Sequence, residues 1–301
     1  MSDKIEKLYN IHPWLKVATT LEDYIAPDYY DVLLKDYIFQ GKEDFRHLIE
    51  FIKERVVSNP VVLELGCGTG RVAEEVLKSF KVARLDLVDL SPKMIRFSKE
   101  KFKKIKNIEF YQKDSLEYLE KTEEKYDLVY SLWSFSHSVY QHIEKSSPLI
   151  KVQERLNLVL GKTFKENLNG EGSFFLIHSD WLSEEQSVLI KQWARKDKPI
   201  AEVGVQGPSK IWIESGLKKL EHEGVIRSEI VHYIGEPIVY DSVEKALEVF
   251  INFHLESYFN LSEKIMDIIP DLEDYFKGFT SKDGEVSIRP GCFIFKATKL
   301  K

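Results

Sequence analysis

The sequence predicts an α/β protein with a mostly parallel sheet that helices cover on both faces. From residue 60 onward, short apolar segments of strand length alternate with segments whose apolar residues recur at helical spacing. A glycine-rich turn, "GCGTG", lies directly between the first of these strands and the first of these helices. Alternation of this kind is typical of parallel strands joined by crossover helices.

The elements follow one another in a regular order. We expect strands at 61–65, 83–90, 108–114, 126–133 and 173–180. We expect helices at 71–80, 91–104 and 148–168, the last of them stopped by the turn residues "NGEG". Further helices at 183–199 and 209–224 precede two late strands at 225–234 and 291–299.

Two parts of the chain lie outside this alternation. Residues 1–55 read as helical and are rich in aromatic side chains, and a mostly helical stretch separates the two late strands. We therefore expect an N-terminal helical cap at 1–55 and a main domain at 56–301, with helical lid insertions at about 183–223 and 241–280.

Composition excludes several classes of protein. The 301 residues are 43% hydrophobic and 31% charged, which is typical of a globular chain. A net charge of −6 gives no general attraction to nucleic acid or anionic lipid, and no apolar run has the length of a membrane span or a signal peptide. Cys67 and Cys292 lie far apart and suit reduced thiols. We expect a cytoplasmic monomer or homodimer with neither nucleic acid nor membrane as a partner.

The glycine turn indicates a ligand site. Gly66, Gly68 and Gly70 allow a sharp turn with positive φ and let a ligand approach the main chain where a Cβ would intrude. The next helix offers its N-terminal amides to that ligand. The spacing is G-x-G-x-G, and Glu64 lies two residues before the first glycine. A carboxylate there favours a ligand with positive charge over a pyrophosphate.

Two further acidic residues close the next two strands. Asp89 ends the second strand, where a carboxylate accepts hydrogen bonds from ribose hydroxyls. Asp114 ends the third strand, where a carboxylate accepts from an exocyclic amine such as that of adenine. Open α/β sheets bind ligands at this carboxyl edge. The pattern describes a nucleoside with a cationic tail, although Asp at strand ends is also common in turns.

The motifs "LELGCGTG", "LVDLSPKMI" and "YQKDSLEYL", in this order and spacing, resemble the first three motifs of class I S-adenosylmethionine-dependent methyltransferases. The resemblance covers residues 56–182 and implies a Rossmann-like, seven-stranded sheet with S-adenosylmethionine as the cofactor. It implies a cofactor site made of Glu64, Gly66, Cys67, Gly68, Asp89, Leu90, Met94, Asp114, Ser115 and Leu132. The helical insertion before the last strand is similar to that of trans-aconitate-type methyltransferases.

The sequence signals for the residues that would contact the methyl acceptor are less specific. His137 and His142 follow the fourth strand, where they are either general bases or surface histidines of a loop. His178 and Asp180 end the fifth strand, and Asp180 also suits a turn. As catalytic candidates we take His137, His178 and Asp180, and as candidates for substrate contact Tyr24, Tyr30 and His254. His254 and the tyrosines lie in apolar helical patterns that equally suit a packed core.

Absent motifs narrow the chemistry. No Asn/Asp-Pro-Pro-Tyr motif follows the fourth strand, which disfavours methylation of nucleobases, and we expect no metal because the strand ends carry no acidic cluster beyond Asp180. The leading hypothesis is O- or N-methylation of a small molecule by in-line displacement. The alternatives are a protein or peptide methyltransferase and a non-catalytic regulatory protein that binds the cofactor.

Overall fold

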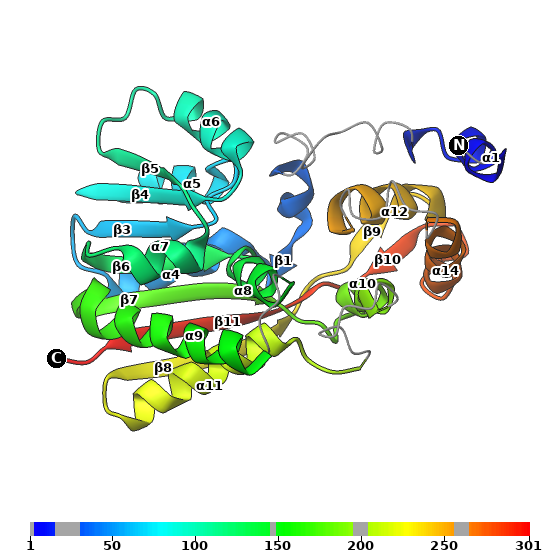
Figure 1. The fold of residues 1–301 in the computed structure, drawn as a ribbon. Helices are drawn as coiled ribbons and strands as arrows, with labels where there is room; N and C mark the ends of the chain where they lie inside the picture. The colour runs from blue at the N-terminus through cyan, green and yellow to red at the C-terminus, as the bar shows by residue number, and fades with distance from the viewer. Residues whose placement is uncertain (1–2, 16–30, 145–148, 195–203, 256–264) are drawn as a thin grey trace. The chain divides into compact units, whose positions relative to one another are not determined.

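Two compact units make up the computed structural model (Figure 1), which describes residues 3–15, 31–144, 149–194, 204–255 and 265–301. The sheet unit comprises Ile38–Asp180, Gln206–Tyr233 and Cys292–Lys301. The insert unit comprises Met1–Tyr37, Trp181–Val205 and Ile234–Gly291. Each unit is thus assembled from three separate segments of the chain.

A seven-stranded sheet forms the centre of the sheet unit, with the order β5-β4-β3-β6-β7-β11-β8. Its strands are β3 (Val61–Leu65), β4 (Arg84–Asp89), β5 (Ile108–Gln112), β6 (Tyr126–Leu132), β7 (Leu168–Ser179), β8 (Ile226–Ile234) and β11 (Gly291–Lys299). The strands from β5 to β7 pair in parallel, and β11 pairs antiparallel with β7. The expected seven-stranded fold is confirmed.

The helices of the sheet unit occupy both faces of this sheet. They are α4 (Asp44–Arg55), α5 (Arg71–Ser79), α6 (Pro92–Lys101), α7 (Ser115–Lys121), α8 (Phe135–Glu144), α9 (Leu149–Lys162) with the π-helical turn η2 (Thr163–Asn167), and α11 (Pro208–His222). Right-handed crossovers place α5 and α6 on one face, and the reversal of strand order after β5 places α7 on the other. Helices α7, α8, α9 and α11 pack together and face the viewer in Figure 1.

Burial and local capping account for these elements. Strands β3, β4 and β6 lie between two helical layers, so almost every residue in them is buried and they read as continuous apolar runs. Helix α6 begins where the Ser91 hydroxyl accepts the amide of Met94, with Pro92 in the first turn. The reversal of strand order puts the ends of β3 and β6 on either side of the switch point, where such folds bind ligands.

Two expectations about the middle of the chain are wrong. The segment after β6, which we treated as a loop, forms α8, so His137 and His142 are helical residues. "NGEG" does not stop a helix in a turn, because the helical segment ends at Asn167 and residues 169–172 belong to β7. The paired residues Leu168 and Ser173 flank this segment, which lies at an irregularity in the pairing of β7 with β6.

The insert unit combines helices with one short antiparallel ribbon, β9 (Ile238–Tyr240) with β10 (Val286–Ile288). A small hairpin, β1 (Ile38–Phe39) with β2 (Lys42–Glu43), belongs instead to the sheet unit. The helices of the insert unit are α1 (Asp3–Ile11), η1 (Leu34–Asp36), α10 (Glu184–Ala194), α12 (Val243–Val249) with η3 (Phe250–His254), and α14 (Ile265–Lys277). Helix α14 packs against both α10 and α12.

The chain leaves the sheet after β8 and returns to it in β11, its neighbour in the sheet, so the long insertion lies between adjacent strands. Helices α4 and α11, which we assigned to the N-terminal cap and the first lid, fall within the sheet unit. The cap and lid roles of the outer segments remain predictions.

Candidate functional site

The glycine turn holds three consecutive left-handed positions. Gly66, Gly68 and Gly70 have φ of 72°, 51° and 76°. A Cβ on Gly66 would lie 1.9 Å from Oγ of Ser134, so the backbone there has no room for a side chain. A Cβ on Gly68 would meet nothing within 4 Å. The turn is therefore packed against its own domain at Gly66 and open at Gly68.

Asp89, at the end of β4, holds the turn through its carboxylate. Oδ2 accepts the amide of Gly68 and Oδ1 accepts the amide of Ser91, both at 2.8 Å. Burial raises the pKa of Asp89, and these two amide hydrogen bonds oppose that rise. A carboxylate has about four acceptor positions, so each oxygen keeps capacity for one hydroxyl donor.

Glu64 is the second-to-last residue of β3, and its side chain is buried. The Tyr130 hydroxyl donates to Oε2 at 2.9 Å. Burial raises the pKa of the Glu64 carboxyl to about 8, although the Tyr130 hydrogen bond and the charge of Arg71 act in the opposite direction. A carboxyl in this state lacks a close cationic partner that would keep it ionised, and a bound ammonium group would supply one.

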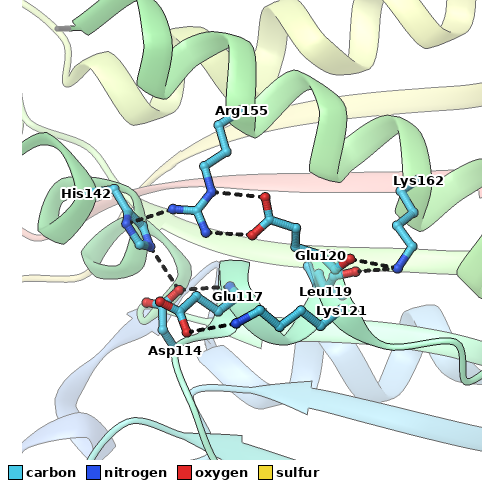
Figure 2. A network of polar contacts seen from close by, with 8 residues as sticks. All are labelled: Asp114, Glu117, Leu119, Glu120, Lys121, His142, Arg155 and Lys162. Carbon is cyan, nitrogen blue, oxygen red and sulfur yellow. Dashed lines mark hydrogen bonds and ion pairs between the residues drawn. The ribbon is translucent and has the colours of Figure 1, made fainter. Parts of the chain in front are cut away.

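Asp114 caps helix α7 and is the end of a side-chain relay, which Figure 2 shows. Oδ1 accepts the amide of Glu117 and the Nε2 of His142, both at 3.0 Å. Arg155 Nη1 lies 2.9 Å from His142 Nδ1. Because Arg is only a donor, Nδ1 is the acceptor and the proton of His142 is on Nε2, directed at Asp114.

The second carboxylate oxygen of Asp114, Oδ2, differs from Oδ1 in its hydrogen bonding. Oδ2 is buried and has no hydrogen-bond partner among the described residues. An unpaired buried carboxylate oxygen costs free energy unless a donor reaches it, so this atom is a ready acceptor for an amine. Arg155 in turn donates twice to Glu120, from Nε at 3.3 Å and Nη2 at 2.7 Å, which holds the relay in place.

The remaining cofactor candidates border the same edge. Leu90 follows β4 and is 46% exposed, whereas the thiol of Cys67 is buried, and its pKa is raised well above the usual value by that burial. Met94, Ser115 and Leu132 are buried in the first turn of α6, the first turn of α7 and the end of β6. We call this region, at the ends of β3, β4 and β5, the β3–β5 edge.

The opposite part of the sheet edge, at the ends of β7 and β8, is the β7–β8 edge. His178 is fully buried there, and burial lowers its pKa to about 4. Its Nδ1 lies 2.7 Å from the carbonyl oxygen of Ser179, and its Nε2 lies 2.7 Å from Oγ of Ser209. The neutral ring donates from Nδ1 to the Ser179 carbonyl, and its Nε2 is in contact with the Ser209 hydroxyl, so both nitrogens already have a neighbour within hydrogen-bond distance.

Asp180 lies next to His178 and is also buried. Its Oδ2 is 2.7 Å from Nε2 of His232 on β8, and Gln206 donates to Oδ1. His137, on α8, is exposed. The structure thus brings Asp180 together with two residues that the sequence did not single out, Gln206 and His232.

Some candidates lie beyond what the structure describes. Tyr24 and Tyr30 are outside the described residues, and of His254 only the backbone, at the end of η3, is described. Sequence reasoning missed Tyr130, His142 as a partner of Asp114, and His232. His232 and Tyr130 carry no local motif, and only strand pairing places them beside Asp180 and Glu64.

Within the described residues, no three His, Cys, Asp or Glu side chains gather as metal ligands would. Among those same residues, no helix has the length and apolar character needed to cross a membrane. The site therefore consists of acidic, imidazole and hydroxyl groups arranged along one sheet edge.

Comparison with known proteins agrees with this geometry. Residues 62–148 match a family model described as a methyltransferase domain. Malonyl-[acyl-carrier protein] O-methyltransferase 1 of Ilyobacter polytropus is 40% identical over 83 residues, which are 28% of this chain and 28% of that protein. The malonyl-[acyl-carrier protein] O-methyltransferase of Halalkalibacterium halodurans is 30% identical over 138 residues, which are 44% of this chain and 47% of that protein. The chain spans less than half the length of these curated relatives.

A solved structure gives the fold independently. The YcgJ protein of Bacillus subtilis has a TM-score of 0.50 to this chain at 15% identity, over 85% of this chain and 99% of that one. The match of residues 62–148 confirms the resemblance that the three motifs indicated. These residues form a class I S-adenosylmethionine-dependent methyltransferase domain, set in the seven-stranded sheet typical of that class.

Proposed function

We propose that this protein transfers the methyl group of S-adenosylmethionine to an oxygen or nitrogen of a small molecule. The observation that carries the proposal is the β3–β5 edge, where three acidic side chains meet an open glycine turn within a matched methyltransferase domain. Malonyl-[acyl-carrier protein] O-methyltransferases among the relatives support a metabolite-sized acceptor group.

The residues present fit the cofactor. Gly68 leaves space beside the main chain, and Asp89 keeps acceptor capacity for ribose hydroxyls. The unpaired Oδ2 of Asp114 suits the exocyclic amine of adenine, and the buried Glu64 suits an ammonium group. The ammonium group, the ribose hydroxyls and the exocyclic amine of the ligand thus each have a matching acidic side chain in this chain.

The cofactor supplies a methyl group on a sulfonium sulfur, already activated for displacement. The protein's task is then to hold the acceptor in line with that group and to exclude water. Alignment of this kind is worth roughly 7 to 11 kcal/mol of the barrier. The acceptor would bind at the β7–β8 edge, beyond β6 from the glycine turn.

A carrier-bound acceptor is the second candidate. The relatives named above act, by their names, on malonyl groups carried by a protein, so a small acceptor group attached to a carrier is consistent with the same site. Methylation of a protein side chain and cofactor binding without catalysis are the remaining alternatives.

Transfer from isotopically labelled S-adenosylmethionine into a fractionated metabolite extract tests the proposal. We expect label in the small-molecule fractions, and S-adenosylhomocysteine should bind in calorimetry. Label only in protein would favour a carrier or a protein side chain. Binding of NAD, with no binding of S-adenosylmethionine or S-adenosylhomocysteine, would contradict the assignment of the site.

A further inference from the structure

We infer that His232 is the general base for methyl transfer, positioned by Asp180, and that the acceptor atom therefore carries a proton at neutral pH. This inference rests on the proposed function. It selects hydroxyl and amine acceptors over carboxylates, which are already ionised at neutral pH and need no base.

The geometry of the pair is that of an oriented imidazole. Nε2 of His232 lies 2.7 Å from Oδ2 of Asp180. The Asp180 side chain is 5% exposed, whereas that of His232 is 45% exposed. A carboxylate accepts, so the His232 proton is on Nε2 and the lone pair is on Nδ1. A buried carboxylate that selects the tautomer and leaves the outer nitrogen basic is the arrangement used in acid–base catalysis.

No hydrogen bond to Nδ1 of His232 is formed within the part of the chain that the structure describes, and the His232 side chain is 45% exposed. The imidazole stacks on Phe293, with ring centroids 4.6 Å apart and an angle of 22°. Lys210 Nζ lies 4.4 Å from the centroid of the same Phe293 ring. Stacking on Phe293 and the hydrogen bond to Asp180 thus hold the His232 ring in one orientation.

Gln206 contributes to the positioning of Asp180. Its amide donates to Oδ1, so both oxygens of the carboxylate are engaged and the carboxylate cannot rotate freely. His178 is an alternative base on the same strand, but both of its ring nitrogens are occupied. Asp180 therefore sets the tautomer of His232, whose Nδ1 has no hydrogen-bond partner among the described residues.

The position of Asp180 along the sheet edge agrees with a role for His232 as the general base. Asp180 follows β7, which lies two strands from β3 in the order β3-β6-β7. Neighbouring strands are about 4.8 Å apart, so Asp180 lies roughly 10 Å along the edge from the glycine turn. His232 reaches Asp180 from β8 across β11.

A proton on the acceptor oxygen or nitrogen passes to Nδ1 of His232, and the electron pair that is released forms the bond to the methyl carbon. The bond from that carbon to the sulfonium sulfur breaks, and its electron pair remains on sulfur. The imidazolium, stabilised by Asp180, then loses its proton to water.

The first test is the tautomer of His232, which does not depend on activity. Long-range ¹H–¹⁵N spectra of histidine-labelled protein, assigned with His232→Gln, should show Nδ1 of His232 unprotonated at neutral pH. In Asp180→Asn the amide can donate to Nε2, and the tautomer should change. A wild-type spectrum with the proton on Nδ1 would overturn the inference.

The second test is transfer of labelled methyl into a metabolite extract, followed by mild alkali. Alkali cleaves methyl esters to methanol and leaves methyl ethers and methylamines intact. We expect alkali-stable label, lowered about 100-fold in His232→Gln, because general bases contribute roughly 10²- to 10⁴-fold. His222→Gln, an exposed histidine at the end of α11, is the matched control and should leave transfer unchanged.

A pH profile separates base catalysis from a loss of structure. At saturating S-adenosylmethionine the wild-type rate should rise with pH to a plateau, and this rise should disappear in His232→Gln while S-adenosylhomocysteine binds as before. Asp180→Glu should restore part of the rate that Asp180→Asn loses. Asp180 also acts electrostatically on His178 from β7 and on Cys292 from β11, and the charges of Lys210 from α11 and His137 from α8 act on His178.

The outcomes distinguish the inference from the function on which it rests. Alkali-labile label, or equal transfer by the wild type and His232→Gln, overturns the inference and leaves the methyltransferase function standing. Absence of transfer by the wild type into any fraction overturns the proposed function, and the inference with it.

Discussion

Asp89 of the β3–β5 edge and Asp180 of the β7–β8 edge are held in place by different means. Asp89 is held by amides of its own strand end and of the glycine turn, at Ser91 and Gly68. Asp180 is held by the side chains of residues 26 and 52 positions further along the chain. The first arrangement follows from backbone geometry, and the second from packing of distant strands.

This difference has a consequence for function. A carboxylate held by main-chain amides, as Asp89 is, changes little when neighbouring side chains change, which suits recognition of one constant cofactor. A site made of side chains on separate elements changes with every substitution, which suits a variable acceptor. Substitutions at the β3–β5 edge should therefore alter cofactor binding, and those at the β7–β8 edge should alter transfer alone.

The largest effect is expected at Gly66. Gly66→Ala would place a Cβ 1.9 Å from Ser134 at a positive φ, and we expect loss of at least about 2 kcal/mol of stability together with cofactor binding. Gly68→Ala is the matched control, because it adds a Cβ at a positive φ with nothing within 4 Å. Urea denaturation should show a cost of about 1 kcal/mol for Gly68→Ala. Equal costs for both variants would mean that the turn is not packed against Ser134.

Asp89→Ala is expected to have the next largest effect. It removes an acceptor for both the turn amide and the ribose, so binding of S-adenosylhomocysteine should weaken by about 1.5 to 3 kcal/mol. Calorimetry measures this change, with His232→Gln as a control from the other edge. An unchanged dissociation constant in a folded Asp89→Ala protein would show that Asp89 only shapes the turn.

The raised pKa of Glu64 predicts that stability and cofactor affinity both depend on pH. Its folded pKa of about 8 lies above the unfolded value, so the folded protein holds the extra proton, and Glu64 costs stability increasingly as pH rises from about 4.5 to 8. An ammonium ligand favours the ionised form, so cofactor affinity should rise up to about tenfold per pH unit between pH 6 and 8. Calorimetry in buffers of different ionisation enthalpy should detect a released proton, and Glu64→Gln should abolish the release. No proton release in the wild type would mean that Glu64 does not meet the ammonium.

The smallest effect concerns the relay behind Asp114. His142→Phe removes the donor that orients Oδ1, and we expect cofactor affinity to fall by about 0.5 to 1.5 kcal/mol, the worth of one hydrogen bond. Arg155→Met should have a smaller effect of the same sign, because it only loosens the tautomer of His142. Affinity that is unchanged in both variants would confine the relay to holding α7, α8 and α9 together.

Much of the β3–β5 edge was predictable from the sequence. The strands that end at Leu65 and Asp89 are buried on both faces, so they read as apolar runs, and their turns carry their own glycine and acidic residues. The positions of Glu64, Asp89 and Asp114 along one edge follow from parallel strands, and the structure has them there. Short-range rules suffice for such features.

Tertiary structure decided which side chains meet at the β7–β8 edge and which environment each histidine has. His142 appeared to be a loop residue and is a helical residue that donates to Asp114, 28 positions away. His178 looked like a base and is a buried neutral ring, because β7 and α11 enclose it. The sequence by itself determined the elements and the cofactor motifs, since these depend on the periodicity of neighbouring residues. Which imidazole keeps an accessible nitrogen was decided only when β8 paired beside β11 and brought His232 to Asp180, because burial and long-range hydrogen bonds are properties of the packed chain.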